Sequence, residues 1–137
     1  MKIDSTKVLV SAPQQKVFEF LKDSNNVFHL MPHDKISDWQ ATTEQCSFKV
    51  QGGIMITLIQ DGEEGTDKIY MKSGEKSPFP FRLTINTQLE NENQTTGFIQ
   101  FDGEVNMFLK MMVEKPLTNL FNYMSDKLQA YFQEDKE

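Results

Sequence analysis

Residues 106–132, NMFLKMMVEKPLTNLFNYMSDKLQAYF, carry the apolar pattern that decides the fold. At about 100° per residue, the main apolar positions fall within an arc of roughly 160°, which predicts a long helix with one face against a sheet. Proline removes one intrahelical hydrogen bond and clashes with the carbonyl four residues back, so Pro116 predicts a kink or break near residue 112. The apolar face comprises Leu109, Val113, Leu117, Leu120, Phe121, Tyr123, Met124, Leu128 and Tyr131.

The N-terminal part of this helix carries more apolar side chains than one face needs. Only Lys110, Glu114 and Lys115 give it polar cover before Pro116. A helix that packs on a single surface keeps its opposite face polar. We therefore expect this end to meet two surfaces: a cavity on one side, and short helices or a partner chain on the other. The surplus side chains are Met107, Phe108, Met111 and Met112.

Upstream of the helix, from residue 35 to 106, the apolar pattern changes to a period of two, which predicts strands. The turn signals QGG, DGEEG, SGEKSP and ENENQ separate them. Connections this short join antiparallel neighbours, because parallel pairs need crossovers of about a dozen residues. The pattern predicts a six-strand meander over about 36–42, 46–51, 54–60, 66–73, 79–90 and 95–105.

The same alternation predicts which side chains face inward. At residues 54–59 both faces are apolar, so periodicity cannot choose between them. The predicted inner set is Phe48, Val50, Ile56, Leu58, Ile69, Met71, Phe81, Leu83, Ile85, Ile99 and Phe101. The predicted outer set is Lys49, Gln51, Thr57, Lys68, Lys72, Arg82, Thr84, Gln100 and Asp102.

The N-terminal region predicts one strand and two short helices. Residues 3–10 alternate as a strand would, with Ile3, Lys7 and Leu9 on one side and Thr6, Val8 and Val10 on the other. We expect Ser11 to cap the first helix and Pro13 to lie in its first turn. Its apolar positions are Val17, Phe18 and Leu21, and a second short helix should end or bend at Pro32.

Composition limits the partners and the compartment. The chain of 137 residues fits one domain, and its net charge of −6 disfavours nucleic acid and anionic lipid surfaces. No apolar run approaches the roughly 18 residues of a membrane span, so we expect no membrane insertion. MKIDSTKVLV lacks signal-peptide features, and Cys46 is the single cysteine. Both observations favour a cytoplasmic protein without disulfides.

No group of residues predicts a catalytic or metal site. His29 and His33 lie four apart beside Asp34, but Pro32 disrupts the helix that such spacing needs, and no third ligand follows. Cys46 has no basic neighbour in the sequence to activate it. DGEEGTD lacks the ligand pattern of a calcium loop. We therefore expect no catalytic residues, no metal and no cofactor.

Four stretches, together with the order of elements, resemble a known superfamily. They are SAPQQKVFEFLKD (11–23), LMP (30–32), KSPFPFRLTIN (76–86) and MMVEKPLTNLFNYMSDKL (111–128). They resemble a small bacterial branch of the START-like, or SRPBCC, superfamily, which includes the birch-pollen allergen family and polyketide cyclases. The resemblance implies an α+β helix-grip fold in one domain, 1–137. A seven-stranded curved antiparallel sheet would wrap around the long C-terminal helix, with two short helices between strands one and two.

The resemblance also implies a hydrophobic cavity between sheet and helix, which holds a lipid-, sterol- or polyketide-like molecule in many members. Eight methionines supply adaptable apolar surface for such a ligand. The alternatives are a cyclase or hydrolase in the same cavity, or a filled core with a homodimer through Met107, Phe108, Met111 and Met112. The expected ligand-binding residues are Phe48, Val50, Ile56, Leu58, Ile69, Met71, Phe81, Leu83, Ile99, Phe101, Phe108, Met112, Leu117 and Leu120.

Overall fold

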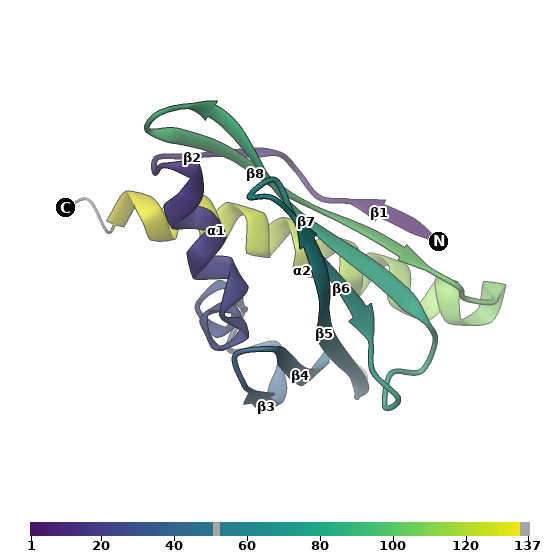
Figure 1. The fold of residues 1–137 in the computed structure, drawn as a ribbon. Coiled ribbons are helices and arrows are strands. Elements are labelled where there is room, and N and C mark those ends of the chain that lie inside the picture. Colours follow the sequence, from purple (N-terminus) through teal and green to yellow (C-terminus); the bar gives the residue numbers. More distant parts are fainter. Residues whose placement is uncertain (51–52, 135–137) are drawn as a thin grey trace.

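The computed structural model describes residues 1–50 and 53–134. An eight-stranded antiparallel sheet curves over one long helix (Figure 1). The strand order is β1-β8-β7-β6-β5-β4-β3, and β2 also pairs with β8. The strands are β1 (Lys2–Asp4), β2 (Val8–Val10), β3 (Ser37–Ala41), β4 (Gln45–Val50), β5 (Ile54–Glu64), β6 (Lys68–Ser73), β7 (Phe81–Asn91) and β8 (Gln94–Gly103). The helices are α1 (Gln14–Lys22), the 3-10 helix η1 (Ser24–Leu30) and α2 (Met107–Glu134).

The predicted meander from β3 to β8 is confirmed, because each of these strands pairs antiparallel with the next. One strand boundary of the meander differs by more than two residues: β5 extends through most of the predicted turn DGEEG and ends at Glu64. The pairing with β6 shifts between Gln60 and Glu63, and Gly62 there has φ +100°, which a residue with a side chain rarely adopts. The chain therefore turns only at Gly65.

The first predicted strand is divided in two, which raises the strand count from seven to eight. Asp4 pairs with Gln100 and Val8 with Gly97, so the N-terminal segment has one more residue than β8 over this stretch. The extra residue changes the phase of the alternation. Ile3 and Val8 are consequently both buried, although they were predicted on opposite sides.

Ser5 supports this interruption from the core side. Its Oγ accepts a hydrogen bond from the Ile99 backbone N–H at 2.7 Å and shares another with Ser125 Oγ at 2.8 Å. Ser5 and Ser125 are both buried. The irregular stretch is therefore held to β8 and to α2 without leaving the Ile99 amide unpaired.

The short helices cover one end of the sheet. Pro13 occupies the N-cap of α1 rather than its first turn, and no side chain caps this helix, so the expected cap by Ser11 is wrong. The extended ψ of 147° at Pro13 places the first helical residue at Gln14. By contrast, Asp23 caps η1 by accepting the Asn25 N–H at 3.0 Å. As predicted, this second helix ends before Pro32.

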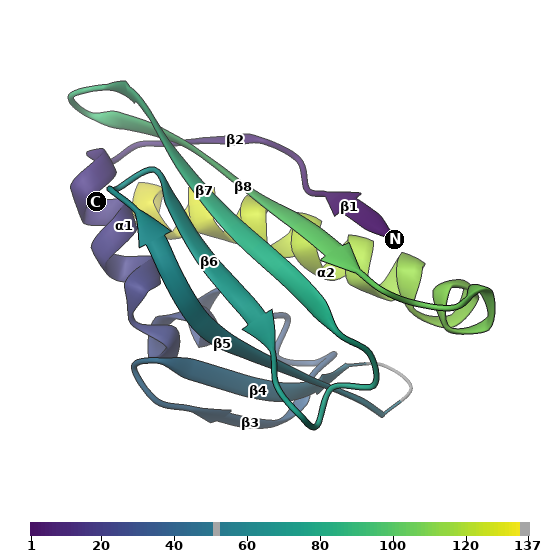
Figure 2. The ribbon, with the colours of Figure 1, turned by 45° about the vertical axis from the view of Figure 1, so that its right-hand side comes forward.

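Helix α2 lies across the inner face of the sheet, with α1 near its C-terminal end (Figure 2). Asn106 Oδ1 accepts the Leu109 N–H at 2.9 Å and so caps its first turn. The helix continues through Pro116, so of the predicted kink or break, the break does not occur. Tyr123 was predicted on the buried face but is 41% exposed, whereas Ser125, which is not a member of that predicted face, is buried. No helix in the described part of the chain is both long enough and apolar enough to cross a membrane.

The core lies between the sheet and α2. All eleven residues of the predicted inner set are buried, which confirms the period-two reading. Ile56 and Leu58 face the core at the ambiguous position in β5, and Thr57 lies outward and half-buried. Of the predicted outer set, Lys49, Lys68 and Thr84 are also half-buried, and Gln51 lies outside the described residues. Lys72, Arg82, Gln100 and Asp102 are exposed.

Ser5→Ala tests the support at the divided strand. The substitution removes the acceptor of the buried Ile99 N–H, so we expect the free energy of unfolding to fall by about 1–3 kcal/mol in urea denaturation. Ser125→Ala removes only the shared hydroxyl bond and should cost less. Exposed Ser37→Ala is the control and should change little. Equal losses for Ser5→Ala and Ser37→Ala would contradict this role.

Candidate functional site

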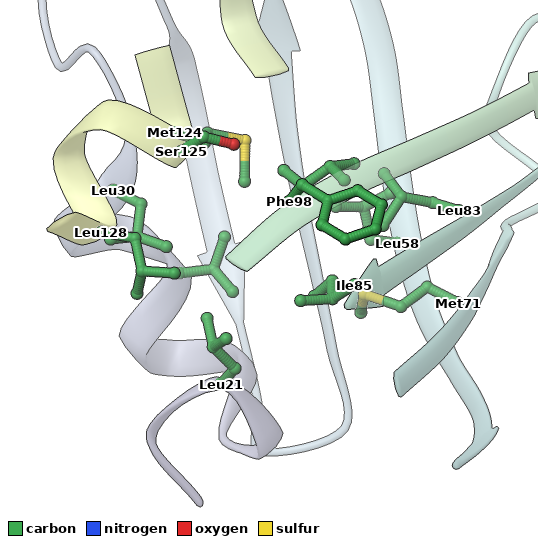
Figure 3. A pocket seen from close by; sticks show the side chains of 12 residues that line it. Leu21, Leu30, Leu58, Met71, Leu83, Ile85, Phe98, Met124, Ser125 and Leu128 are labelled. Carbon is green, nitrogen blue, oxygen red and sulfur yellow. The ribbon is translucent and has the colours of Figure 1, made fainter. Parts of the chain in front are cut away.

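A small apolar cavity lies where the sequence predicts a ligand pocket, between the sheet and α2 (Figure 3). In the figure, Leu58, Met71 and Leu83 of the sheet lie opposite Met124 and Leu128 of α2. The cavity has a volume of only about 20 Å³, enough for about one water molecule. The lining consists of Leu21, Val27, Leu30, Leu58, Met71, Leu83, Ile85, Phe98, Ile99, Met124, Ser125 and Leu128. The core is therefore nearly filled.

The structure places the expected ligand-binding residues in different surroundings. Leu58, Met71, Leu83 and Ile99 line the cavity. Most of the others pack elsewhere in the core: Phe48, Ile56, Ile69, Phe81, Phe101 and Leu117. Phe108 and Met112 are exposed to solvent, and they line neither the cavity nor the groove described next.

Several cavity residues were missed as site residues. Leu21 was predicted on the apolar face of the first helix, but its contact with the cavity depends on how α1 is placed over the sheet. Val27 and Leu30 lie in the breaker-rich stretch after α1, where the sequence predicts only a short helix. Ser125 is the polar member of the lining, and its hydroxyl is engaged by Ser5.

A more open groove lies beside Pro116, between α2, the end of β4 and residues 32–36. The volume of this groove is about 260 Å³. Val50 and Leu120, both on the expected list, form part of it and also belong to the hydrophobic core. The remaining lining residues are Pro32, Asp34, Lys35, Ile36, Pro116, Asn119 and Tyr123. We call this feature the Pro116 groove.

The wall formed by residues 32–36 is held by local backbone and ring contacts. The Lys35 N–H donates to the Pro32 carbonyl at 2.8 Å, which closes a tight turn. His33 then folds back, with its Nε2 2.8 Å from the Phe28 carbonyl oxygen and its ring stacked on Phe28 at 4.1 Å. Pro32 is buried, whereas Asp34 and Lys35 are exposed at the rim.

The groove combines apolar walls with a polar and charged rim. Pro32, Pro116 and Leu120 provide apolar surface. Tyr123 adds a partly exposed aromatic ring with a hydroxyl group. Lys35 and Asp34 contribute one charge of each sign at the rim. This arrangement suits a small molecule with an apolar body and one polar end, because burial of the body is favourable while the polar group stays hydrated or paired.

The two residues with shifted pKa values, Cys46 and Tyr70, line neither the cavity nor the Pro116 groove. Burial raises the pKa of the Cys46 thiol to about 12. Partial desolvation raises the pKa of Tyr70, and its hydrogen bond to Glu64 adds to this effect. A neutral thiol is a poor nucleophile, so Cys46 is a packing residue of β4.

The two histidines do not meet as metal ligands. His33 stacks on Phe28, whereas the His29 ring lies 5.7 Å from that of Tyr131. Across the ranges 1–50 and 53–134, no three His, Cys, Asp or Glu side chains gather closely enough to hold a metal ion.

Comparison with known proteins identifies the fold. No protein-family model matches the sequence, and no curated protein matches it. The structure is similar to that of XoxI from Bacillus cereus, with a TM-score of 0.75 at 12% identity over 99% of this chain and 98% of the other. A START superfamily protein from Mycobacterium smegmatis matches with a TM-score of 0.71 at 13% identity over 97% of both chains.

A solved enzyme structure has the same architecture. Norcoclaurine synthase from Thalictrum flavum, in complex with dopamine and hydroxybenzaldehyde, matches with a TM-score of 0.69 at 12% identity, over 100% of this chain and 88% of that one. At such identities the likeness concerns the fold alone. The chain has the START-like helix-grip fold, with one strand more than the sequence predicts.

Leu58→Ala distinguishes a filled core from a hollow one. In a filled core, truncation of this buried side chain leaves a new void, and we expect the free energy of unfolding to fall by about 2–5 kcal/mol. The matched control is Leu89→Ala, since Leu89 is 62% exposed on β7 and should cost no more than about 0.5 kcal/mol. Similar losses for the two variants in urea denaturation would show that Leu58 borders a large solvent-filled space and not a nearly filled core.

Alkylation tests the state of Cys46. With its pKa raised to about 12, the folded thiol stays protonated at pH 8 and is buried, so iodoacetamide should leave the native protein unmodified. Unfolding in urea returns the thiol to an ordinary pKa of about 8.5. One adduct should then form, as detected by intact-mass spectrometry. Rapid modification of the native protein would contradict this assignment.

Proposed function

We propose that this protein binds a small apolar molecule with one polar end, which enters at the Pro116 groove and reaches the region between α2 and the sheet. The observation that carries the proposal is that the groove shares Val50 and Leu120 with the hydrophobic core. A ligand that displaces the Leu120 side chain would therefore pass directly from solvent to the interior.

The sizes of the two spaces determine how binding would proceed. The groove, at about 260 Å³, is close to the roughly 300 Å³ at which small-molecule pockets begin, whereas the inner cavity holds about one water. The polar end would remain at Lys35 or Tyr123. The apolar body would enlarge the cavity by moving Met71 and Met124, whose unbranched side chains repack at low cost.

The fold is compatible with this role. The START superfamily protein and norcoclaurine synthase share the architecture, and the latter holds two small aromatic molecules. These likenesses supply a precedent for ligands in the fold but do not indicate which ligand this chain takes.

We favour binding or carriage over cyclase or hydrolase chemistry. Acid–base catalysis needs a proton donor or acceptor within hydrogen-bond reach of the reacting atom. The side chains that line the cavity are apolar apart from that of Ser125, whose hydroxyl already bonds to Ser5. Asp34, Lys35 and Tyr123 lie at the groove, where they can orient a polar group.

A fluorescence titration with ANS tests the proposal. The native protein should bind the dye with increased emission, and Asn119→Trp, which places a large ring in the groove, should weaken binding at least tenfold. The matched control is Asp126→Trp, which adds the same ring at an exposed position of α2 away from the groove. Its affinity should match that of the native protein.

Two results would contradict the proposed site. One is an absence of ANS binding to the native folded protein. The other is binding that persists in Asn119→Trp but disappears in Met111→Glu, because this would place the dye at the exposed N-terminal end of α2. Circular dichroism on each variant would confirm that the fold is retained.

A further inference from the structure

The turn at residues 32–36 borders two adjoining spaces. The Pro116 groove lies between this turn and α2. A second space of about 410 Å³, which we call the outer hollow, lies between the turn and the β3–β4 pair. Its lining residues are Asp34, Lys35, Ile36, Ser37, Lys49 and Val50. Asp34 and Lys35 line both spaces, so they stand where the groove and the hollow meet.

Of the charged residues that line these spaces, Lys49 is already neutralised, because its Nζ lies 3.1 Å from Asp38 Oδ2. Asp34 and Lys35 differ from it. Among residues 1–50 and 53–134, neither of their side chains has an ion-pair partner, and the two do not pair with each other. The described chain therefore presents one unpaired negative charge and one unpaired positive charge at the mouth of the groove.

The backbone that carries these two charges is anchored on both sides. The Lys35 N–H donates to the Pro32 carbonyl at 2.8 Å, and Pro32 is itself buried. Between them, His33 is held by its stacking on Phe28 at 4.1 Å. Binding of a ligand at Asp34 and Lys35 would therefore order side chains on a backbone that is already placed, which lowers the entropic cost of binding.

We infer that the polar end of the ligand is a zwitterion, with its ammonium group at Asp34 and its acidic group at Lys35. This inference rests on the proposed function, in which the apolar body of the ligand lies in the Pro116 groove. A ligand with a single charge is attracted by one of the two residues and repelled by the other, so the two effects largely cancel. A zwitterion in this orientation is attracted by both.

The rest of the molecule is consistent with a head group of no net charge. The chain carries a net charge of −6, and such a field disfavours the approach of anions. A cation would be attracted over long distances but would meet Lys35 at the groove. The apolar surface of Pro116 and Leu120 beside the charges strengthens short-range attraction, because it keeps water from part of the site.

Two chemical classes join a zwitterionic head to an apolar body. One is an α-amino acid with a large apolar side chain, and the other is a single-chain lipid with a phosphocholine head. A body the size of one aromatic ring suits the groove of about 260 Å³ as it stands. A long alkyl chain would also have to displace core side chains such as Met71 and Met124.

NMR titration with three ligands that share one phenyl body tests the inference. At pH 7 phenylalanine is a zwitterion, 3-phenylpropionate an anion and phenethylamine a cation. Phenylalanine should bind about fivefold more tightly than either of the others, the effect of one exposed ion pair. The amide signals that shift should include those of residues 34–36 and of residues 119–123.

Two charge-removing variants should change the order of affinities in opposite ways. Asp34→Asn should weaken phenylalanine and phenethylamine several-fold and strengthen 3-phenylpropionate, because it removes the partner of the ammonium group. Lys35→Gln should weaken phenylalanine and 3-phenylpropionate and strengthen phenethylamine. The matched controls are Asp61→Asn and Lys72→Gln, which alter an ion pair of 3.8 Å that lines neither space. They should leave all three affinities unchanged.

A second arm distinguishes the two sources of the zwitterion. Dodecylphosphocholine, kept below the concentration at which it forms micelles, carries the same two charges on a long alkyl chain. If it binds more tightly than phenylalanine and is weakened by both charge variants, the ligand is a lipid. The opposite order of affinities assigns the head group to an amino acid.

The inference fails separately from the proposed function. It is overturned if ANS binds at the groove and is weakened by Asn119→Trp, while neither zwitterion binds more tightly than the ligands with one charge. It is also overturned if Asp34→Asn and Lys35→Gln change the three affinities in the same direction. If ANS and all four ligands fail to bind the native protein, the proposed function itself is wrong.

Discussion

The fold depends on burial of one face of α2 against the curved sheet. Val113, Leu117 and Phe121 are each nearly inaccessible, and the Phe121 ring lies 5.2 Å from that of Phe101 on β8. The inner face of the sheet is mainly apolar along its central strands, so it is unstable in water without this cover. At the other end of α2, Phe20 of α1 packs on Tyr131 at 4.6 Å, which places the short helices.

How closely this contact is filled limits how a ligand of the proposed kind could enter. The cavity between the sheet and the helices α1, η1 and α2 holds about one water molecule. A ligand would therefore have to displace core side chains or remain in the Pro116 groove. Displacement is most favourable where the lining is adaptable, and Met71 and Met124 provide this between the strands and α2. The groove, bounded by residues 32–36, is the side on which polar groups meet this interior.

Local patterns in the sequence predict the elements well but predict long-range matches poorly. Leu83 and Ile85 alternate with polar neighbours, and this period is sufficient to place them inside. The change of phase near Ser5 cannot be seen in the same way, because it depends on the pairing with β8 almost a hundred residues later. Ser125 is a polar residue that becomes buried only because Ser5 supplies its partner. Cavity size is equally hidden, since it depends on the summed volumes of side chains from many elements.

Because β1 and β2 both pair with β8, the chain can complete its native sheet only late in folding. Both strands pair with β8, and β8 also pairs with β7, so the N-terminal segment closes the sheet against a strand that follows it by about ninety residues. During synthesis these first residues leave the ribosome long before their partner exists. The hairpins from β3 to β7 can form earlier from contacts close in sequence. Closure of the sheet and docking of α2 should therefore be late, coupled events, completed only when nearly the whole chain has emerged.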